Sequence, residues 1–303
     1  MKRLLAGFLA GLGSCLVVSC SADADPSAGG GLRVVATTTQ AGAAAQEVGG
    51  DAIALTVLLA PGVEAHDFEL RPEQGAALEQ ADVILASGAG LEDWLADTLT
   101  AVGAEDRVRD LSDGVTLRTD DATGSVDPHS WLSGPNAVTM VENVRDALAE
   151  ADPDGAEAYR DRAAAAVDRL EAADAEVRPL IDEVPADDRG IVTDHDALGY
   201  FIDEYGLRFI GSVFPSLDVS AEPSAQEIER LVALIRDEGV TAIFTESSID
   251  PRLAEAVAAE TDARLVEEPL YTDSLGPPGS GADTLAGMLV HDARVIRDGL
   301  LGD

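Results

Sequence analysis

Short apolar runs alternate with amphipathic stretches along the chain from Leu32 onward. Apolar runs bounded by Gly, Pro or polar residues predict buried strands, whereas apolar residues that recur at spacings of three and four predict helices. The expected strands are 32–36, 53–59, 82–86, 107–111, 190–193, 207–213, 242–245 and 264–267. The expected helices are 41–48, 72–80, 91–102, 135–150, 197–205, 224–238, 251–261 and 282–299. This order predicts an α/β fold with mainly parallel sheets.

The longest helical pattern covers residues 154–184 and has neither Gly nor Pro in its middle. A helix of about 30 residues spans about 45 Å at about 1.5 Å per residue, which is enough to cross two small domains. We therefore expect two α/β lobes joined by one long, rigid helix. The predicted domains are an N-terminal lobe at 32–151, a linking helix at 152–184 and a C-terminal lobe at 185–303.

The N-terminal residues 1–19 have the pattern of a secretory signal peptide, with a positive start followed by an apolar run. The run ends in Val-Val-Ser-Cys, which resembles a bacterial lipobox and predicts a lipid on Cys20. The alternative is an ordinary signal peptide that happens to contain a cysteine. Residues 20–31 are rich in Ser, Ala, Asp and Gly, so we expect a flexible tether. Cys15 would leave with the signal peptide, and the fold would then depend on its core without disulfides.

The chain is strongly acidic, with a formal net charge of -37. Lys2 is its only lysine. Nucleic acid is therefore disfavoured as a partner, because phosphate binding needs a basic surface. The acidic residues are spread over the whole chain, which indicates general solvation and does not by itself indicate a metal site.

Three of the four histidines lie in loops of similar kind. His66 follows the expected strand 53–59, in a loop bounded by Pro61 and Pro72. His129 follows a proline, and His195 lies where a strand ends and a helix begins. Ligands of open α/β sheets are held at the rim beyond the strand ends. Three imidazoles brought there together would make a metal site.

Two of these histidines, His129 and His195, have an ordinary explanation when taken alone. A loop histidine near a tryptophan, as His129 is, often serves packing, and His195 lies near a helix start that a neighbouring aspartate can cap. The separations of 63 and 66 residues match no local metal motif, so tertiary structure would have to assemble the site between the halves. Asp273 follows the last expected strand and is the candidate fourth ligand, whereas His291 in the last expected helix is interpreted as structural or exposed.

Two carboxylates are candidates for holding these imidazoles in place. Asp127 lies two residues before His129, and Glu246 ends an apolar strand. Metal-binding histidines commonly donate their second ring N–H to such a group. A carboxylate next to buried residues, as Glu246 is, needs hydrogen-bond partners in any case.

Six segments of the chain resemble the zinc- and manganese-binding solute-binding proteins of bacterial ABC transporters, the ZnuA/TroA-like family. The segments are PGVEAH at 61–66, SGAGLEDWL at 87–95, DPHSWL at 127–132, TDHDALGYF at 193–201, FTESS at 244–248 and DSLG at 273–276. The resemblance implies two α/β lobes, one linking helix and one metal ion in the cleft. The ligands that it implies are His66, His129, His195 and Asp273. Residues 112–126 contain no histidine, so the His-rich loop of zinc-specific relatives is missing.

Three imidazoles and one carboxylate suit tetrahedral zinc, which makes Zn²⁺ the expected cargo. Manganese prefers more oxygen ligands, and family members that resemble manganese carriers tend to have a carboxylate at the position of His195. Mn²⁺, or Fe²⁺, remains the alternative. The expected function is capture of the ion and delivery to an ABC permease. We expect a monomer, held by the lipid on Cys20 at the outer face of the bacterial cytoplasmic membrane.

An exported zinc hydrolase is the alternative from another functional class. A catalytic zinc keeps one position open for water, whereas Asp273 would fill that position here. The sequence also contains neither an HExxH pair nor a GxSxG elbow. We therefore expect a protein that is not an enzyme.

The predicted anchor can be tested by mass spectrometry of the mature N-terminus. We expect the mature chain to begin at Cys20 and to carry the mass of a lipid, because small residues directly precede this cysteine. A mature chain that begins after Cys20 without modification would eliminate the anchor.

Overall fold

A computed structural model of the protein describes residues 31–120, 124–217 and 222–302. The predicted signal peptide, Cys20 and all but the last residue of the predicted tether lie outside the described residues. No helix within the described ranges is both long and apolar enough to cross a membrane.

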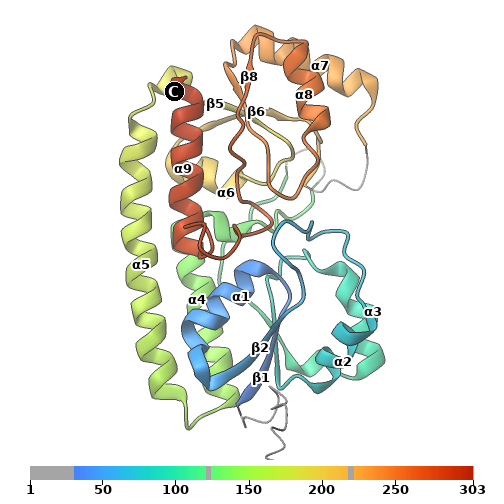
Figure 1. Ribbon diagram of the computed structural model, residues 1–303, viewed down its shortest axis with the longest axis vertical. Coiled ribbons are helices and arrows are strands. Elements are labelled where there is room, and N and C mark those ends of the chain that lie inside the picture. The colour runs from blue at the N-terminus through green and yellow to red at the C-terminus, as the bar shows by residue number, and fades with distance from the viewer. Residues whose placement is uncertain (1–30, 121–123, 218–221, 303) are drawn as a thin grey trace, which may run out of the picture. The chain divides into compact units, whose positions relative to one another are not determined.

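The first sheet contains four parallel strands and is covered by helices from the first half of the chain (Figure 1). The strands are β1 (Leu32–Ala36), β2 (Ile53–Val57), β3 (Val83–Ala86) and β4 (Val108–Asp110), in the order β2-β1-β3-β4. Every residue of β3 is buried, as expected for a central strand with helices on both faces. All four strands lie within the predicted ranges, and β4 confirms the weakest of the four patterns.

The second sheet is also parallel and four-stranded. Its strands are β5 (Gly190–Thr193), β6 (Arg208–Ser212), β7 (Ala242–Ile243) and β8 (Arg264–Leu265), in the order β6-β5-β7-β8. The strands β7 and β8 are shorter than predicted. Their backbones nevertheless stay paired for one more step, because the Phe244 N–H donates to the Val192 carbonyl at 2.9 Å and the Val266 N–H donates to the Ile243 carbonyl at 2.9 Å.

The helices follow the predicted pattern, apart from one. They are α1 (Thr39–Gly49), α2 (Pro72–Gln80), α3 (Ala96–Val102), α4 (Gly134–Ala151), α6 (Gly199–Tyr205), α7 (Ala225–Glu238), α8 (Arg252–Ala259) and α9 (Leu285–Leu301). The predicted helix 91–102 begins late, as a short turn at Asp93–Leu95 that leads into α3. The loop before it, in which Gly88, Ala89 and Gly90 all have positive φ, cannot be helical, and Glu92 still lies outside the helical region with φ -101° and ψ 45°.

One long helix, α5 (Ala156–Asp182), runs alongside both sheets (Figure 1). Its 27 residues correspond to about 40 Å at about 1.5 Å per residue. It packs against α4 of the first half and α9 of the second half. Its buried positions are Ala156, Tyr159, Ala163, Ala166, Leu170, Ala173, Val177 and Ile181. Alanine at half of these positions lets the neighbouring helices approach closely.

The predicted fold class, an α/β protein with two mainly parallel lobes joined by one long helix, is confirmed. We use N-terminal lobe for the first sheet with its helices and C-terminal lobe for the second sheet with its helices. The domain limits at residues 151 and 184 stay a prediction. Apolar residues of the first sheet, of one face of the second sheet and of α4, α5 and α9 join in one large core, so the two lobes share packing along the helical side. The other face of the second sheet, with Val192 and Ile243, packs with α7 and α8 in a second cluster.

Candidate metal centre

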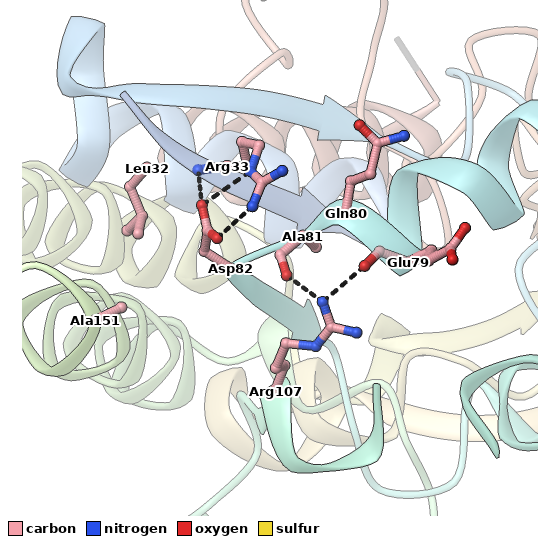
Figure 2. A pocket seen from close by; sticks show the side chains of 8 residues that line it. All are labelled: Leu32, Arg33, Glu79, Gln80, Ala81, Asp82, Arg107 and Ala151. Carbon is pink, nitrogen blue, oxygen red and sulfur yellow. Dashed lines mark hydrogen bonds and ion pairs between the residues drawn. The ribbon is translucent and has the colours of Figure 1, made fainter. Parts of the chain in front are cut away.

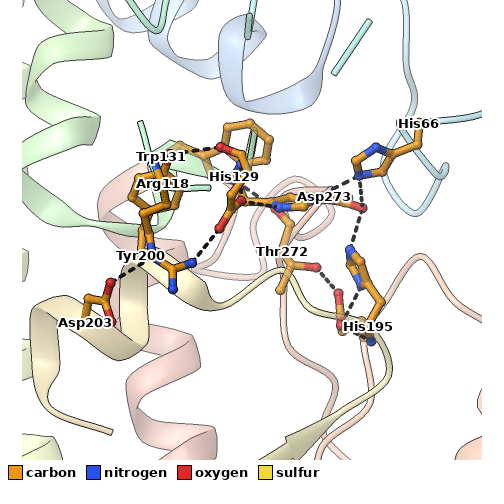
Figure 3. A network of polar contacts seen from close by, with 11 residues as sticks. His66, Arg118, His129, Trp131, His195, Tyr200, Asp203, Thr272 and Asp273 are labelled. Atoms are coloured by element: carbon orange, nitrogen blue, oxygen red, sulfur yellow. Dashed lines mark hydrogen bonds and ion pairs between the residues drawn. The ribbon is translucent and has the colours of Figure 1, made fainter. Parts of the chain in front are cut away.

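Four side chains from four distant loops meet between the two sheets (Figure 3). His66 lies in the loop after β2, His129 precedes a short turn at Ser130–Leu132, and His195 lies two residues after the end of β5. Asp273 lies in the loop between β8 and α9. One possible ligand atom from each residue lies within 4.8 Å of all the others. The structure thus brings together all four residues that the sequence analysis selected as ligands.

The ring nitrogens Nε2 and the Asp273 carboxylate face one another. His129 Nε2 lies 3.1 Å from His66 Nε2 and 3.2 Å from Asp273 Oδ1. Asp273 Oδ2 lies 3.4 Å from His195 Nε2 and 3.7 Å from His66 Nε2. Among the described residues, His195 Nε2 and both Asp273 oxygens have no hydrogen-bond partner. Buried polar atoms without partners are rare in proteins, so this donor set fits a cation held at the common point.

Asp127 holds the ring of His129 from the side opposite to the centre. Its Oδ1 accepts the ring N–H of His129 Nδ1 at 2.8 Å and the backbone N–H at 3.0 Å. With the proton on Nδ1, the lone pair of Nε2 points to the centre. Asp127 is itself buried, and it receives a hydrogen bond from the Arg118 guanidinium at 2.8 Å.

Arg118 ties this loop to α6 of the C-terminal lobe (Figure 3). Its Nε donates to Asp203 Oδ2 at 2.8 Å, and its backbone N–H donates to the Tyr200 hydroxyl at 2.9 Å. The same hydroxyl donates to the Asp127 carbonyl at 2.9 Å. The loop that carries His129 is therefore fastened to the opposite lobe by three contacts.

Glu246 holds the ring of His195 in the corresponding way. Its Oε1 accepts the ring N–H of His195 Nδ1 at 2.9 Å and the backbone N–H at 3.2 Å. Its Oε2 accepts a short hydrogen bond from the Thr272 hydroxyl. Asp194 Oδ2 accepts the backbone N–H of Glu246 at 2.8 Å, and burial together with the charge of Glu246 raises the pKa of Asp194 to about 7.

The charges in the centre shift the pKa values of its members strongly. Burial by itself lowers the pKa of His129, but the carboxylates of Asp273 and Asp127 outweigh it and raise that pKa to about 10. For His195, burial is likewise outweighed by Glu246 and Asp273, which raise its pKa to about 9. Burial tends to raise the pKa of Asp273, but the facing histidines hold it well below the ordinary range.

His66 is the one partly exposed member of the group, and its loop is held by Glu64 and Trp94. The Glu64 carboxylate accepts the backbone N–H groups of His66 and Asp67, each at 2.8 Å. The Trp94 indole N–H donates to the Ala65 carbonyl at 2.9 Å. A cavity of about 530 Å³ leads to His66, and its lining includes Ala89, Gly90, Asp93 and Pro128. Among the four residues, His66 is therefore the one that borders the cavity.

A larger surface pocket, of about 730 Å³, lies away from this centre, where β1 and β3 begin (Figure 2). Its two arginines are already occupied within the protein. Arg33 binds both carboxylate oxygens of Asp82, and Arg107 donates to the backbone carbonyls of Glu79 and Ala81. Neither arginine of this pocket is therefore free to bind a ligand, and the pocket lining contains no histidine.

Comparison with known proteins agrees with this geometry. A family model described as "Zinc-uptake complex component A periplasmic" (ZnuA) matches residues 34–299. The chain belongs to the ZnuA family. The family and the relatives that match this chain are substrate-binding components of transport systems, which confirms the expectation that the protein is not an enzyme. Other relatives are named as substrate-binding lipoproteins of metal ABC transporters.

The proteins that are similar to this chain are named for different metals. The manganese-binding lipoprotein MntA of Halalkalibacterium halodurans is 28% identical over 302 residues, which cover 99% of each chain. The iron-binding protein YfeA of Yersinia pestis is 31% identical over 254 residues, covering 80% of this chain and 78% of that one. The structure of the periplasmic zinc-binding protein TroA of Treponema pallidum superposes with a TM-score of 0.84 at 27% identity, covering 89% of this chain and 99% of that one.

Several residues around the centre were not identified from the sequence. Arg118 and Thr272 contact the two carboxylates Asp127 and Glu246, and Trp94 lies in a segment that was noted only for its family resemblance. Gln40, whose side-chain amide donates to the Thr272 carbonyl at 2.8 Å, belongs to none of the motifs found in the sequence. No local motif marks these residues, because their partners lie between 9 and 232 positions away at no regular spacing. His291 was interpreted as structural or exposed, and it is half-buried with its Nε2 3.0 Å from the Pro269 carbonyl.

Replacing Arg118 by Met removes the cation that faces the buried carboxylate of Asp127. We expect the free energy of unfolding of the metal-free protein to fall by about 1–3 kcal/mol, because a buried acceptor loses a charged partner. Urea denaturation followed by circular dichroism measures this change. Arg252→Met is the control, since Arg252 pairs with Asp250 on the surface. A loss no larger than that of the control would contradict the role given to Arg118.

Proposed function

We propose that this protein captures Zn²⁺ between its two lobes and delivers it to an ABC permease. The observation that carries the proposal is the convergence of three imidazole nitrogens and one carboxylate on one buried point. His66, His129, His195 and Asp273 would be the ligands. Membership in a family of metal-binding transport components supports the general role, whereas the identity of the ion is inferred from the ligand chemistry.

The ligand set favours zinc. Imidazole nitrogen and carboxylate oxygen are ordinary zinc ligands, and four of them complete a tetrahedral site. Three neutral imidazoles and one carboxylate would leave a net charge near +1 on a divalent ion. The carboxylates of Asp127 and Glu246, which accept the Nδ1–H groups, would offset this remaining charge and raise the basicity of the rings.

Mn²⁺ is the second candidate, and one feature of the site favours it. Both oxygens of Asp273 face the centre, one toward His129 and the other toward His195 and His66. Bidentate binding by Asp273 would raise the coordination number and the share of oxygen, both of which suit manganese. Relatives named for manganese and iron are consistent with this alternative.

The location that we propose follows from the family and the N-terminal pattern. Relatives are named as lipoproteins, and the sequence predicts a lipid on Cys20. The protein would then remain at the outer face of the bacterial cytoplasmic membrane, close to its permease. There it would bind the ion before transport, and the long helix α5 would limit the movement of one lobe against the other.

The ligand set can be tested by metal analysis of protein purified without added metal. We expect about one Zn²⁺ per chain in the unmodified protein, and a loss of zinc affinity in His195→Ala and Asp273→Ala. The loss should exceed the roughly 10–100-fold that removal of an outer hydrogen-bond partner costs, because a direct ligand is removed. His291→Gln is the control and should keep its zinc. Full zinc affinity in Asp273→Ala would contradict the assignment of Asp273 as a ligand.

Zinc affinity should fall steeply as the pH is lowered. In the metal-free protein the pKa values of His129 and His195 are about 10 and about 9, so both rings carry an extra proton at neutral pH. Zinc must displace these protons, and each displaced proton makes the affinity fall about tenfold per pH unit below the pKa. Competition with a chelator of known pH dependence measures the slope. Equal affinity at pH 7.5 and pH 4.5 would exclude a site made of three histidines.

A further inference from the structure

The loop that carries Asp273 follows the second sheet in the sequence, yet it is bound mainly to the N-terminal lobe. The Thr272 carbonyl accepts two hydrogen bonds, from the Gln40 side-chain amide at 2.8 Å and from the Trp131 indole at 2.9 Å. Two residues further on, the Gly62 N–H donates to the Ser274 hydroxyl at 2.7 Å. The backbone on both sides of Asp273 is thus fixed by residues of the N-terminal lobe.

Gln40 occupies a position from which it can act as a fixed support. It lies in the first turn of α1, is fully buried, and contacts Thr272 across 232 positions of sequence. Its side-chain oxygen accepts the Thr39 hydroxyl at 3.0 Å, which leaves the amide N–H₂ to face the Thr272 carbonyl. The Thr39 oxygen in turn accepts the Leu275 N–H at 2.9 Å. Residues 39 and 40 therefore hold the loop on both sides of Asp273.

The hydrogen bonds of this loop to the C-terminal lobe end at Thr272, the residue before Asp273. The Leu270 N–H donates to the Thr245 carbonyl at 2.8 Å, and the Tyr271 N–H donates to Asp292 Oδ1 at 2.9 Å. Thr272 contacts both lobes. Its hydroxyl donates to Glu246 of the C-terminal lobe, and its carbonyl accepts a hydrogen bond from Gln40 of the N-terminal lobe. Between the Thr272 carbonyl and the Leu275 N–H, the loop forms hydrogen bonds with Gln40, Trp131, Gly62 and Thr39. All four of these residues belong to the N-terminal lobe.

We propose that Gln40 is a positioning residue for Asp273 and that it makes Asp273 a ligand of the N-terminal lobe. This inference rests on the proposed function. His66, His129 and Asp273 then form a half-site within one lobe, and His195 is the single ligand that the C-terminal sheet adds. Gln40 holds the loop backbone and does not touch the ion. Its effect on zinc therefore passes through the Asp273 carboxylate.

The test measures zinc affinity and the zinc dissociation rate in Gln40→Met, which keeps the size of the side chain and removes the donor. We expect the affinity to fall about 10–100-fold, the range known for partners that orient metal ligands. Gln46→Met is the matched control, because Gln46 lies on the same helix with an exposed side chain. Thr39→Val tests the same support from its other side and replaces Gln40→Met if that variant does not fold.

Two double variants separate positioning from a merely structural role. In Asp273→Ala three histidines remain, and three histidines hold zinc in other proteins. If the effect of Gln40 passes through Asp273, adding Gln40→Met to this variant should change the zinc affinity less than about twofold. In His195→Ala the half-site remains, so Gln40→Met should keep its full effect. Thermal unfolding of the metal-free variants serves as the check on folding.

The outcomes distinguish this inference from the proposed function. Wild-type affinity in Asp273→Ala would overturn the ligand set itself. If Asp273→Ala weakens binding but Gln40→Met does not, only the role of Gln40 is overturned. An equal effect of Gln40→Met with and without Asp273 would show a general structural role, and loss of its effect in His195→Ala would overturn the half-site.

Discussion

The burial of one carboxylate among three imidazoles is the constraint on which the rest of the structure depends. Asp273 lies in the interior, its oxygens have no hydrogen-bond partner among the described residues, and ring nitrogens face it at 3.2–3.7 Å. A buried carboxylate needs a compensating positive charge. In the metal-free protein the protonated histidines supply it, which explains their raised pKa values. A metal ion would replace those protons, so metal and protons compete for one set of atoms.

The surrounding hydrogen bonds fix the direction in which each ring points. Asp127 and Glu246 take the Nδ1 protons of His129 and His195, and thereby turn both Nε2 lone pairs to the centre. Arg118 and Thr272 hold these carboxylates from outside. Such ordering lowers the entropy that a ligand set loses when it binds an ion. Arg118 also joins the two lobes through its hydrogen bond to Asp203 of α6, in addition to the packing of α5 and α9.

Most of the fold could be predicted from the sequence, because its signals are local. The spacing and the length of the apolar runs predicted each strand that the structure describes. The uninterrupted helical spacing around Leu170 predicted α5. The late start of α3 was not predicted. Helical spacing continues through residues 91–95, but the positive φ of Ala89 and its glycine neighbours keeps the preceding loop out of a helix. Backbone conformation at a non-glycine residue such as Ala89 leaves no trace in a hydrophobic pattern.

The sequence by itself determined the α/β class, the long helix and the four residues that gather at the centre, since loop position and residue type are local properties. Only the tertiary structure decided that their atoms come within 4.8 Å of one another and that Arg118 and Gln40 take part. It also connected the Asp273 loop to α1, across more than two hundred residues. Hydrogen bonds between distant segments form because folding buries their donors and acceptors together, and no spacing along the chain records which pairs will meet.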